Sequence, residues 1–419
     1  MPTKRRFVAF LLVVVCGASV LWAGAEGEER VKIGGLVPLT GPLSEYGEGF
    51  RKAGDLAVLH FEAAGFPIEL RFADTETSAI PGVEAARTLV DIERVIGIAG
   101  AASSGVTIPI AQSVTIPSQI PQISNASTSS LITFLPADEG QDFLFRTTAS
   151  DQLQSVVLGK LAADEGYKKA AVFYVNNPYG QGLMNQFKDS FEYRGGKVVV
   201  AVPHDEKPAP TYVSELKQIA DAGADVMLAL GYPGQATVYL KEFFEAGYNK
   251  NTDLLFCDGT KSVEMPKALG AKNLEGFVGT AAGSLGGVSL ENFKKDYQKY
   301  YGELPPLPYM DSYYDAVVIL GLSAAACQAA GLPVTGVNVR DMIRQISNPP
   351  GTVVYAGEAG LKEALRLIKR GTEINYEGVA GSVDFDANGD VTTPIEVWKF
   401  VLSEPYIQTV RFETDIPAK

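Results

Sequence analysis

Short runs rich in β-branched and aromatic residues alternate along this chain with amphipathic stretches of helical spacing, and this alternation limits the folds open to it. Eight such runs are expected to be strands, at residues 31–39, 68–74, 95–100, 121–124, 170–176, 197–203, 225–231 and 253–258. Between them, apolar side chains recur three and four residues apart, and several of these stretches end at Gly, a usual helix stop. The pattern predicts an α/β fold with parallel sheets covered by helices on both faces.

The 419 residues are enough for two or three domains. The α/β pattern forms two halves, one running to about Arg146 and one from about Asp151 to Gly279, and no low-complexity linker divides them. Beyond Gly279 the chain is mainly helical before a β-like tail at residues 381–401. A helical segment of this kind has to pack on a sheet that already exists, so we expect the chain to cross back between the halves.

The composition excludes several classes of function. Thirty-six basic residues against 49 acidic ones give a formal charge of −13, so no nucleic-acid partner is expected. Two histidines and three cysteines leave little material for a zinc site or a histidine-based active site, and the common catalytic motifs are absent. His60 and His204 are expected to be structural, and the turn at residues 180–182 to start a helix. We therefore expect neither an enzyme nor a cofactor.

Residues 1–25 have the features of a signal peptide. Basic residues at positions 4–6 precede an uncharged stretch over 7–25, and small residues up to Ala25 suit a signal peptidase, so we place cleavage after Ala25. Two alternatives stay open. The stretch is nearly long enough to remain as a membrane anchor, and Cys16 could carry a lipid, although lipoprotein signals need a small residue before the cysteine.

Neither the remaining cysteines nor an acidic loop near the C-terminus gives a clear site. Cys257 and Cys327 could form a disulfide outside the cytoplasm or could be free thiols. Four residues match the first half of a calcium loop: Asp384, Asp386, Asn388 and Gly389. The position that should supply a bidentate Glu holds Ile395, so turns between β segments explain the run without a metal, and no metal is expected.

Hydroxyl-rich turns follow two successive strands, at the sheet edge where open α/β folds bind ligands. Ser103 and Ser104 stand at the start of an expected helix after the strand at 95–100, where hydroxyls and free backbone N–H groups suit an anion such as a carboxylate. An ordinary N-cap explains the same pattern. The second turn follows the strand at 121–124 and contains Ala126, Ser127 and Thr128. Two such turns together favour an anion-binding wall.

Complementary groups follow three strands of the second half. Tyr179, Tyr232 and Asp258 each lie at or just beyond a strand end. A single aromatic in such a place is more often packing than ligand contact. Two tyrosines and an aspartate facing the serine and threonine turns nevertheless predict a cleft with one anion-binding wall and one acidic wall, which fits a small zwitterion.

Several segments together carry a resemblance to a known family: VKIGGLVPLTGPLSEYGEGF, ASSGVTIPIA, ISNASTSSLIT, FRTTASD, NNPYGQGL, LGYPGQ, YYDAVVIL and FDANGD. Over nearly the whole mature chain, the sequence resembles the periplasmic solute-binding proteins of branched-chain amino acid ABC importers, the Leu/Ile/Val-binding type. The resemblance implies two Rossmann-like lobes joined by three hinge crossovers, with a ligand cleft between them. It implies an N-terminal lobe of residues 31–147 plus 282–385 and a C-terminal lobe of residues 148–281 plus 386–419.

The resemblance also implies roles for residues of the first lobe. Ser104 matches the serine that binds the ligand carboxylate. Ala126 and Thr128 match positions that contact the same carboxylate through backbone and hydroxyl groups. Ser103 and Ser127 lie beside matched positions and are included as candidates.

Four further ligand contacts are implied. Tyr179 and Tyr232 match aromatics of the second lobe, and Tyr46 matches an aromatic that lines the side-chain pocket. Asp258 stands where the family has an acidic residue for the ligand's ammonium, with the difference that well-known members have Glu there. This difference leaves amino-acid binding as the expectation but leaves the exact ligand open.

By this resemblance the chain is expected to capture an amino acid, aliphatic or branched-chain, by hinge closure and to deliver it to ABC transporter permease subunits in the membrane. It is expected to work outside the cytoplasm, as a monomer. The alternative is a binding protein or sensor of the same fold for amides, urea or aromatic acids, in which Asp258 would contact N–H groups of a neutral ligand.

Overall fold

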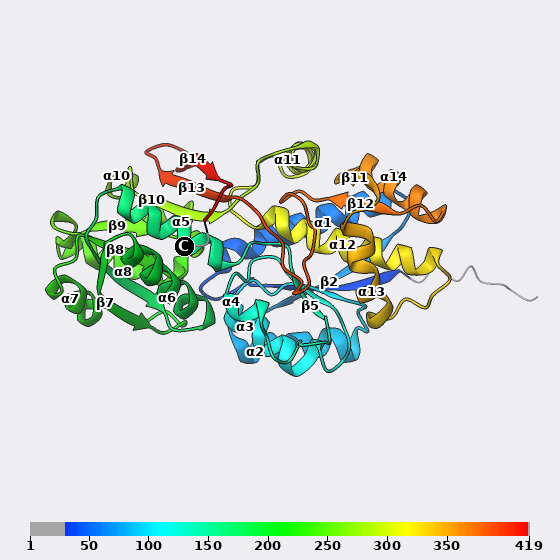
Figure 1. Ribbon diagram of the computed structural model, residues 1–419, viewed down its shortest axis with the longest axis horizontal. Coiled ribbons are helices and arrows are strands. Elements are labelled where there is room, and N and C mark those ends of the chain that lie inside the picture. The colour runs from blue at the N-terminus through cyan, green and yellow to red at the C-terminus, as the bar shows by residue number, and fades with distance from the viewer. Residues whose placement is uncertain (1–29, 418–419) are drawn as a thin grey trace, which may run out of the picture. The chain divides into compact units, whose positions relative to one another are not determined.

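Five parallel strands form the first sheet of the computed structural model, which describes residues 30–417 (Figure 1). In spatial order they are β2 (Ile68–Asp74), β1 (Val31–Val37), β3 (Ile98–Ala99), β4 (Gln122–Ser124) and β5 (Leu144–Arg146). The intervening helices are α1 (Ser44–Ala63), α2 (Ala79–Arg87), α3 (Ser104–Ile110) and α4 (Ser130–Thr133), and π-helical turns at Thr88–Ile92 and Ala111–Thr115 extend α2 and α3. The strand order reverses between β1 and β3, which places a ligand crevice at the ends of these strands.

The second sheet has seven strands in the order β14-β13-β10-β9-β8-β6-β7. They are β6 (Lys169–Val175), β7 (Lys197–His204), β8 (Val226–Leu230), β9 (Asp253–Phe256), β10 (Val278–Ala282), β13 (Ile395–Phe400) and β14 (Ile407–Glu413). The strands from β7 to β10 are parallel and repeat the winding of the first sheet, whereas β13 and β14 pair antiparallel at one edge. Its helices are α5 (Asp151–Asp164), α6 (Pro178–Tyr193), α7 (Val213–Asp221), α8 (Pro233–Glu245), α9 (Glu264–Leu269) and α10 (Ala271–Leu274).

The chain passes between the two sheets three times: between β5 and β6, after β10, and before β13. After the second passage it forms α11 (Val288–Tyr301), α12 (Met310–Ala329), α13 (Gly336–Ser347), α14 (Glu358–Lys369) and a small sheet of β11 (Thr352–Tyr355) and β12 (Ile374–Glu377). These helices pack on α1, β1 and β3, so the predicted return of the chain is confirmed. We call the first sheet with α1–α4 and α11–α14 the first lobe, and the second sheet with α5–α10 the second lobe.

The fold class predicted from the alternation is confirmed, with all eight expected strands present. The strands that the sequence did not reveal include β5, β11 and β12, which are short, and β10, an interior strand of the second sheet. The lobe boundaries given above by residue number stay predictions.

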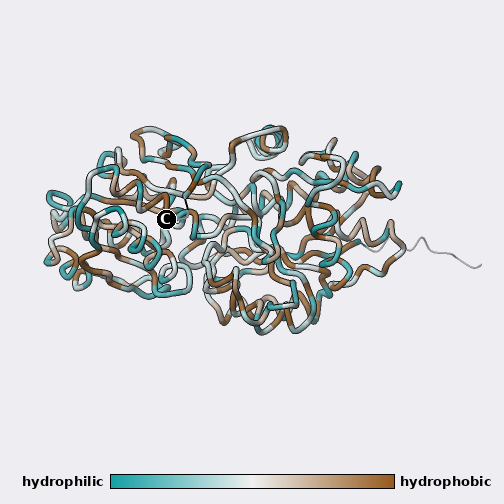
Figure 2. Tube along the Cα trace, viewed as in Figure 1, coloured by the Kyte–Doolittle hydropathy of each residue, from teal (hydrophilic) through white to brown (hydrophobic). Residues whose placement is uncertain are grey.

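Helix α12 is the centre of the first lobe because it is apolar on every side, and nearly all its side chains are buried. Figure 2 shows hydrophobic stretches along the interior strands and hydrophilic ones on the outer loops. One carboxyl group lies inside the helix, beyond the Asp311 of its first turn. The Asp315 carboxylate accepts hydrogen bonds from the Tyr376 hydroxyl (2.8 Å) and from the backbone N–H groups of Val379 (2.8 Å) and Ala380 (2.9 Å). Burial raises the pKa of Asp315 to about 7. This contact ties the chain to α12 just before its third passage between the sheets.

Several sequence-level alternatives are resolved by these contacts. Cys257 and Cys327 are buried free thiols, so the disulfide alternative is wrong. Asp386 accepts hydrogen bonds from the backbone N–H groups of Asn388 (2.7 Å) and Asp390 (3.0 Å), which is the turn expected in place of a calcium loop. Within residues 30–417, no group of His, Cys, Asp and Glu side chains is arranged to hold a metal.

Both histidines are buried in the protein interior. His60 Nδ1 lies 2.7 Å from the Tyr314 hydroxyl, and the other ring nitrogen lies 3.1 Å from Asp296. His204 packs edge-on against Phe173, with ring centroids 4.9 Å apart. Burial lowers the pKa of both rings. These contacts support the structural role predicted for them.

The signal-peptide and Cys16 predictions fall on residues outside the described part of the chain. Across residues 30–417, no helix combines the length and apolar character needed to span a bilayer.

Gly100 is required at the turn that leads from β3 to the hydroxyl-rich segment. Its φ is +117°, and an added Cβ would lie 2.2 Å from the Leu36 carbonyl oxygen. We expect Gly100→Ala to lower the free energy of unfolding by about 2–3 kcal/mol, because both a strained φ and a backbone clash must be accommodated. Gly65→Ala is the matched control: its φ is +82° and no atom lies within 4 Å of an added Cβ. It should cost only about 1 kcal/mol. Equal losses in chemical denaturation would show that the approach to Leu36 is not a constraint.

Candidate ligand-binding site

Polar side chains from both lobes meet at the carboxyl ends of the strands. Ser103 and Ser104 follow β3, Tyr179 lies in the first turn of α6, Tyr232 is the N-cap of α8, and Asp258 begins a 3-10 turn after β9. A cavity of about 30 Å³ lies among them, lined by Leu43, Tyr46, Phe50, Ala102, Ser103, Ser104, Ala126, Tyr179, Tyr232, Asp258, Gly259 and Tyr309. A volume of this size holds about two water molecules.

Seven of the nine candidate residues line this cavity; Ser127 and Thr128 do not. The Ser127 hydroxyl lies 2.8 Å from Thr107 Oγ1 and 3.0 Å from the Ala102 carbonyl oxygen, so it holds the turn after β3 in shape. The Thr128 carbonyl accepts a hydrogen bond from the Asp151 N–H (2.8 Å). Both residues therefore lie behind the cavity wall and connect it to the start of α5.

The Asp258 carboxylate is the charged group of the cavity wall, and it is held by uncharged donors. Its Oδ1 accepts hydrogen bonds from the Tyr179 hydroxyl (2.6 Å) and from Gln154 Nε2 (2.8 Å). Its Oδ2 accepts one from the Tyr309 hydroxyl (2.8 Å). A carboxylate can accept about four hydrogen bonds, so one position on Oδ2 stays open toward a ligand donor.

A second carboxyl group, Asp151, lies fully buried near Asp258. Neither of its oxygens has a hydrogen-bond partner. Burial raises the pKa of Asp151 well above its usual range, and the negative charge of Asp258 raises it further. The nearby Thr128 hydroxyl opposes this rise of the Asp151 pKa, although it makes no hydrogen bond of normal geometry with the carboxyl group. An orphaned buried carboxyl group of this kind needs a donor that the protein itself does not supply.

The opposite wall contains a cluster of hydrogen bonds that joins the lobes. Ser103 Oγ lies 3.0 Å from the Tyr232 hydroxyl and donates to Glu206 Oε1 (3.2 Å). Asn177 Nδ2 donates to the same two groups, at 2.9 and 2.8 Å. Burial raises the pKa of Glu206. Ser103 makes no N-cap hydrogen bond, so the N-cap interpretation of its hydroxyl is wrong.

Ser104 is placed to donate a hydrogen bond to a ligand. Its Oγ accepts a hydrogen bond from the Ser129 N–H (3.2 Å), which leaves the hydroxyl proton free. Ser104 is also the first residue of α3, where backbone N–H groups have no partner within the helix. A carboxylate at this position would therefore meet the Ser104 hydroxyl and the first N–H groups of α3, on the side of the wall where Ser103 and Asn177 already hold the Glu206 carboxylate.

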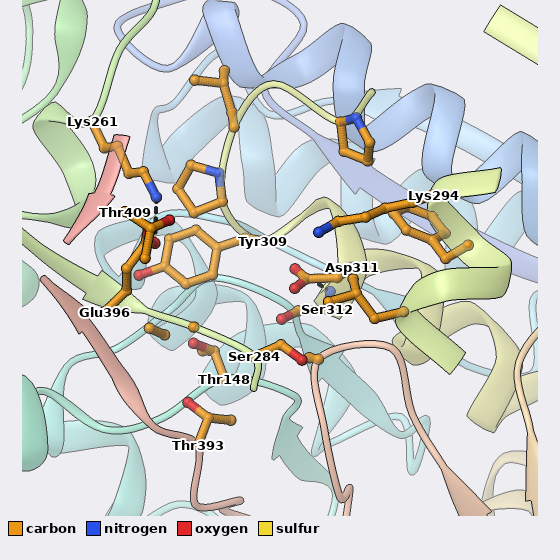
Figure 3. A pocket seen from close by; sticks show the side chains of 18 of the residues that line it. Thr148, Lys261, Ser284, Lys294, Tyr309, Asp311, Ser312, Thr393, Glu396 and Thr409 are labelled. Carbon is orange, nitrogen blue, oxygen red and sulfur yellow. Dashed lines mark hydrogen bonds and ion pairs between the residues drawn. The ribbon is translucent and has the colours of Figure 1, made fainter. Parts of the chain in front are cut away.

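A larger cavity of about 230 Å³ lies beside this site, where the chain passes between the lobes (Figure 3). Its walls include the ion pair of Lys261 and Glu396 (2.5 Å) and, extending toward one another, Lys294 and Asp311. The Tyr309 ring belongs to the walls of both cavities. The strand ends and the open position of Asp258 converge on the smaller cavity, which makes it the candidate ligand-binding site.

Sequence reasoning missed Gln154, Tyr309, Asp151 and Glu206. Gln154 and Asp151 lie in a helix and Tyr309 in a loop, so none of these three follows the strand-end pattern that drew attention to the other residues. Glu206 does follow β7 by two residues, and its carboxylate at the end of a predicted strand was the one signal that could have been used.

A family model and the related proteins described below all indicate the same family for this chain. A family model described as periplasmic binding protein matches residues 30–395. The chemotactic signal transduction system substrate-binding protein BasB of Halobacterium salinarum is 26% identical over 376 residues, 86% of this chain and 84% of that protein. The Leu/Ile/Val-binding protein homolog 7 of Brucella abortus is 26% identical over 346 residues, 76% of this chain and 85% of that protein.

Solved structures share the fold. The leucine binding protein LivK of Thermotoga maritima superposes with a TM-score of 0.74 at 22% identity, over 92% of this chain and 99% of that chain. A solute binding protein of an R. palustris ABC transporter, in complex with 4-hydroxybenzoate, gives a TM-score of 0.74 at 18% identity, over 93% and 98% of the two chains. The predicted resemblance is thus confirmed at the level of the family and the fold.

The unpaired carboxyl group of Asp151 should make the ligand-free protein less stable as the pH rises. The pKa of Asp151 is raised in the folded state. Between about pH 4 and pH 7 the unfolded chain therefore loses this proton more readily than the folded chain does, and the free energy of unfolding falls as the pH rises. We expect Asp151→Asn to gain about 1–3 kcal/mol in the free energy of unfolding, relative to wild type, between pH 4 and pH 7.

Asp164→Asn is the control for this measurement, because Asp164 lies on the same helix, is exposed, and pairs with Lys160. Its difference from wild type should stay within about 0.5 kcal/mol over the same pH range. If the difference in free energy of unfolding between Asp151→Asn and wild type in urea denaturation stays near zero and does not change with pH, the assignment of a strained carboxyl group at Asp151 is contradicted.

Proposed function

This chain belongs to the periplasmic binding protein family, and on that premise we propose that it captures an amino acid, aliphatic or branched-chain, between its two lobes. The observation that carries the proposal is the wall opposite Ser104: a buried carboxylate, Asp258, with one acceptor position open and no cation beside it. The function needs no bond chemistry, only binding and release.

The ligand's ammonium would occupy the acidic wall. It would donate to the open position of Asp258, and its charge would also stabilise the nearby Asp151 carboxylate, which has no hydrogen-bond partner among the described protein groups. Charge-assisted hydrogen bonds of this kind are stronger than neutral ones, and the exclusion of water strengthens them further. A neutral ligand without N–H groups would leave both carboxyl groups unsatisfied, which is costly.

The ligand's carboxylate would lie at Ser104 and the first turn of α3. The Ser104 hydroxyl has its proton free, and Ala126 closes the wall beside it. The apolar part of the ligand would face Leu43, Phe50 and Tyr46. Because one methylene in such a pocket is worth only about 1–3 kcal/mol, several aliphatic side chains should be accepted.

Entry of the ligand requires the lobes to move apart. The cavity of about 30 Å³ holds water but not an amino acid, and hydrogen bonds across it join the lobes. We propose that the three passages of the chain between the sheets act as hinges for this opening, as in other two-lobed binding proteins.

We further propose that the protein works as a monomer outside the cytoplasm, after cleavage behind Ala25, and delivers its ligand to an ABC transporter in the membrane. The family supports the location, and the relatives named above as Leu/Ile/Val-binding support the substrate class.

A second candidate ligand is an aromatic acid, because rings of four tyrosines and Phe50 line the cavity and one structural neighbour holds 4-hydroxybenzoate. The charges argue against it. No lysine or arginine lines the cavity among the described residues, whereas the Asp258 carboxylate would face a ligand that has no positive charge. A chemotactic sensor role, suggested by the name of BasB, uses the same ligand chemistry.

A thermal-shift screen of ligand-stripped protein tests the ligand class. We expect leucine, isoleucine or valine to raise the melting temperature, as mass action requires for a ligand that binds only the folded state. Benzoate, urea and simple amides should give no shift. Asp258→Asn should abolish the response, and Ser104→Ala should weaken binding by about 1–3 kcal/mol. Ser118→Ala, at an exposed position, is the control and should leave binding unchanged. A response to benzoate alone would overturn the amino-acid proposal.

Ligand binding should release protons. An ammonium beside Asp151 would lower the pKa that burial raises in the ligand-free protein, so the bound state holds fewer protons. Affinity should therefore rise with pH above the ordinary range of an aspartate and flatten once Asp151 is ionised in the free protein. Calorimetry in buffers of different ionisation enthalpy measures the released protons. Asp151→Asn should remove both the release and the pH dependence; a pH-independent wild-type affinity would refute the coupling.

A further inference from the structure

The first turn of α1 makes a buried contact with the second lobe through one carboxylate. Glu45 Oε2 accepts a hydrogen bond from the Ser262 hydroxyl (2.6 Å). Glu45 Oε1 accepts two more, from the backbone N–H groups of Val263 (2.9 Å) and Glu264 (3.2 Å). All three donors belong to one short segment of the second lobe, so a single side chain of the first lobe holds that segment.

The neighbouring residue reinforces this contact. The Tyr46 hydroxyl lies 2.8 Å from the Lys261 carbonyl oxygen and 3.1 Å from the Asp258 carbonyl oxygen. The segment held by Glu45 and Tyr46 thus runs over residues 258–264, and it begins at the carboxylate that faces the cavity. Any movement of α1 away from the second lobe would release this segment.

We propose that Glu45 is a positioning residue that latches α1 onto residues 258–264, which fixes Asp258 in its binding geometry and stabilises the closed arrangement of the lobes before ligand arrives. The inference rests on the proposed function in one respect: it deepens the role given there to Asp258. The latch itself is made of protein groups alone.

The energetics of Glu45 suit a contact that forms only on closure. Burial raises the pKa of Glu45, and hydrogen bonds from Ser262, Glu264 and Val263 oppose that rise. The carboxylate therefore loses hydration when the lobes meet and recovers it through charge-assisted hydrogen bonds to the other lobe. When the lobes separate, the same carboxylate returns to water, so the contact can be broken without leaving a buried unpaired charge.

Glu48, one turn further along α1, provides the contrast. Its carboxylate pairs with Arg51 on the same helix, at 2.7 Å, and is exposed to solvent. An exposed pair within one helix contributes little and does not depend on closure. Glu48→Gln is therefore a matched control, with the same change in charge on the same helix.

The first arm of the test needs no ligand. Small-angle scattering of ligand-stripped wild-type protein and of Glu48→Gln should give the same radius of gyration, an average over open and closed lobes. Glu45→Ala should give a larger radius, and Glu45→Gln, which keeps one acceptor oxygen, an intermediate one. If Glu45→Ala keeps the wild-type radius, the latch proposal is wrong, whatever the ligand proves to be.

The second arm measures leucine dissociation by stopped flow. A contact present only in the closed state should, when lost, raise the dissociation rate by about tenfold and leave the association rate unchanged. A purely structural role would instead lower the melting temperature and leave both rates as in wild type, and that result would overturn the proposal. Absence of leucine binding in wild-type protein would count against the proposed ligand only, since the scattering arm still decides the latch.

Discussion

A buried carboxylate without a cation imposes the main constraint on this site. A buried carboxylate such as Asp258 needs hydrogen-bond donors in place of water, and the chain brings three uncharged ones from separate elements. Tyr179 comes from the start of α6, Gln154 from α5, and Tyr309 from the loop before α12. Because Tyr309 belongs to the first lobe and the other two to the second, the hydration of this one group depends on how the lobes meet.

A second buried charge holds the opposite wall in place. Arg146, at the end of β5, donates to both oxygens of Asp390 at 2.6 Å and to the carbonyl oxygen of Ser129 at 2.9 Å. Its guanidinium is fully committed, so it fixes the turn that carries Ala126 without adding a positive charge to the cavity. A cation, Arg146, therefore lies near the site, but its hydrogen bonds hold the wall in shape, and the cavity itself stays acidic.

The sequence predicted those parts of the site that follow from local pattern. Ser103, Ser104 and Ala126 follow strands of the first sheet, and Tyr179, Tyr232 and Asp258 follow strands of the second, so spacing alone grouped each set at the carboxyl edge of its own sheet. Their complementary groups then predicted that the two edges face one cleft. Tyr46 came from the family resemblance instead. The fold class came from the alternation of strands and helices for the same local reason.

The groups that sequence missed depend on packing between distant elements. Tyr309 reaches Asp258 because α12 is buried against α1, and Asp151 lies near Asp258 because α5 packs on β10. Neither position has a signal in its own segment. Ser127 shows the opposite error. Its place in a hydroxyl-rich turn suggested ligand contact, but its hydroxyl instead makes hydrogen bonds with the carbonyl oxygens of Ala101 and Ala102 and with the Thr107 hydroxyl.

These constraints link the site to the motion proposed for it. Asp151 is unsatisfied in the closed, ligand-free arrangement, which favours opening, whereas the Glu45 contact with residues 262–264 favours closure. A ligand ammonium would stabilise the Asp151 carboxylate and leave the Glu45 contact unchanged. The ligand therefore need not supply all of the free energy of closure, only enough to relieve one strained carboxyl group, and this requirement selects for a positive charge at that place in the ligand.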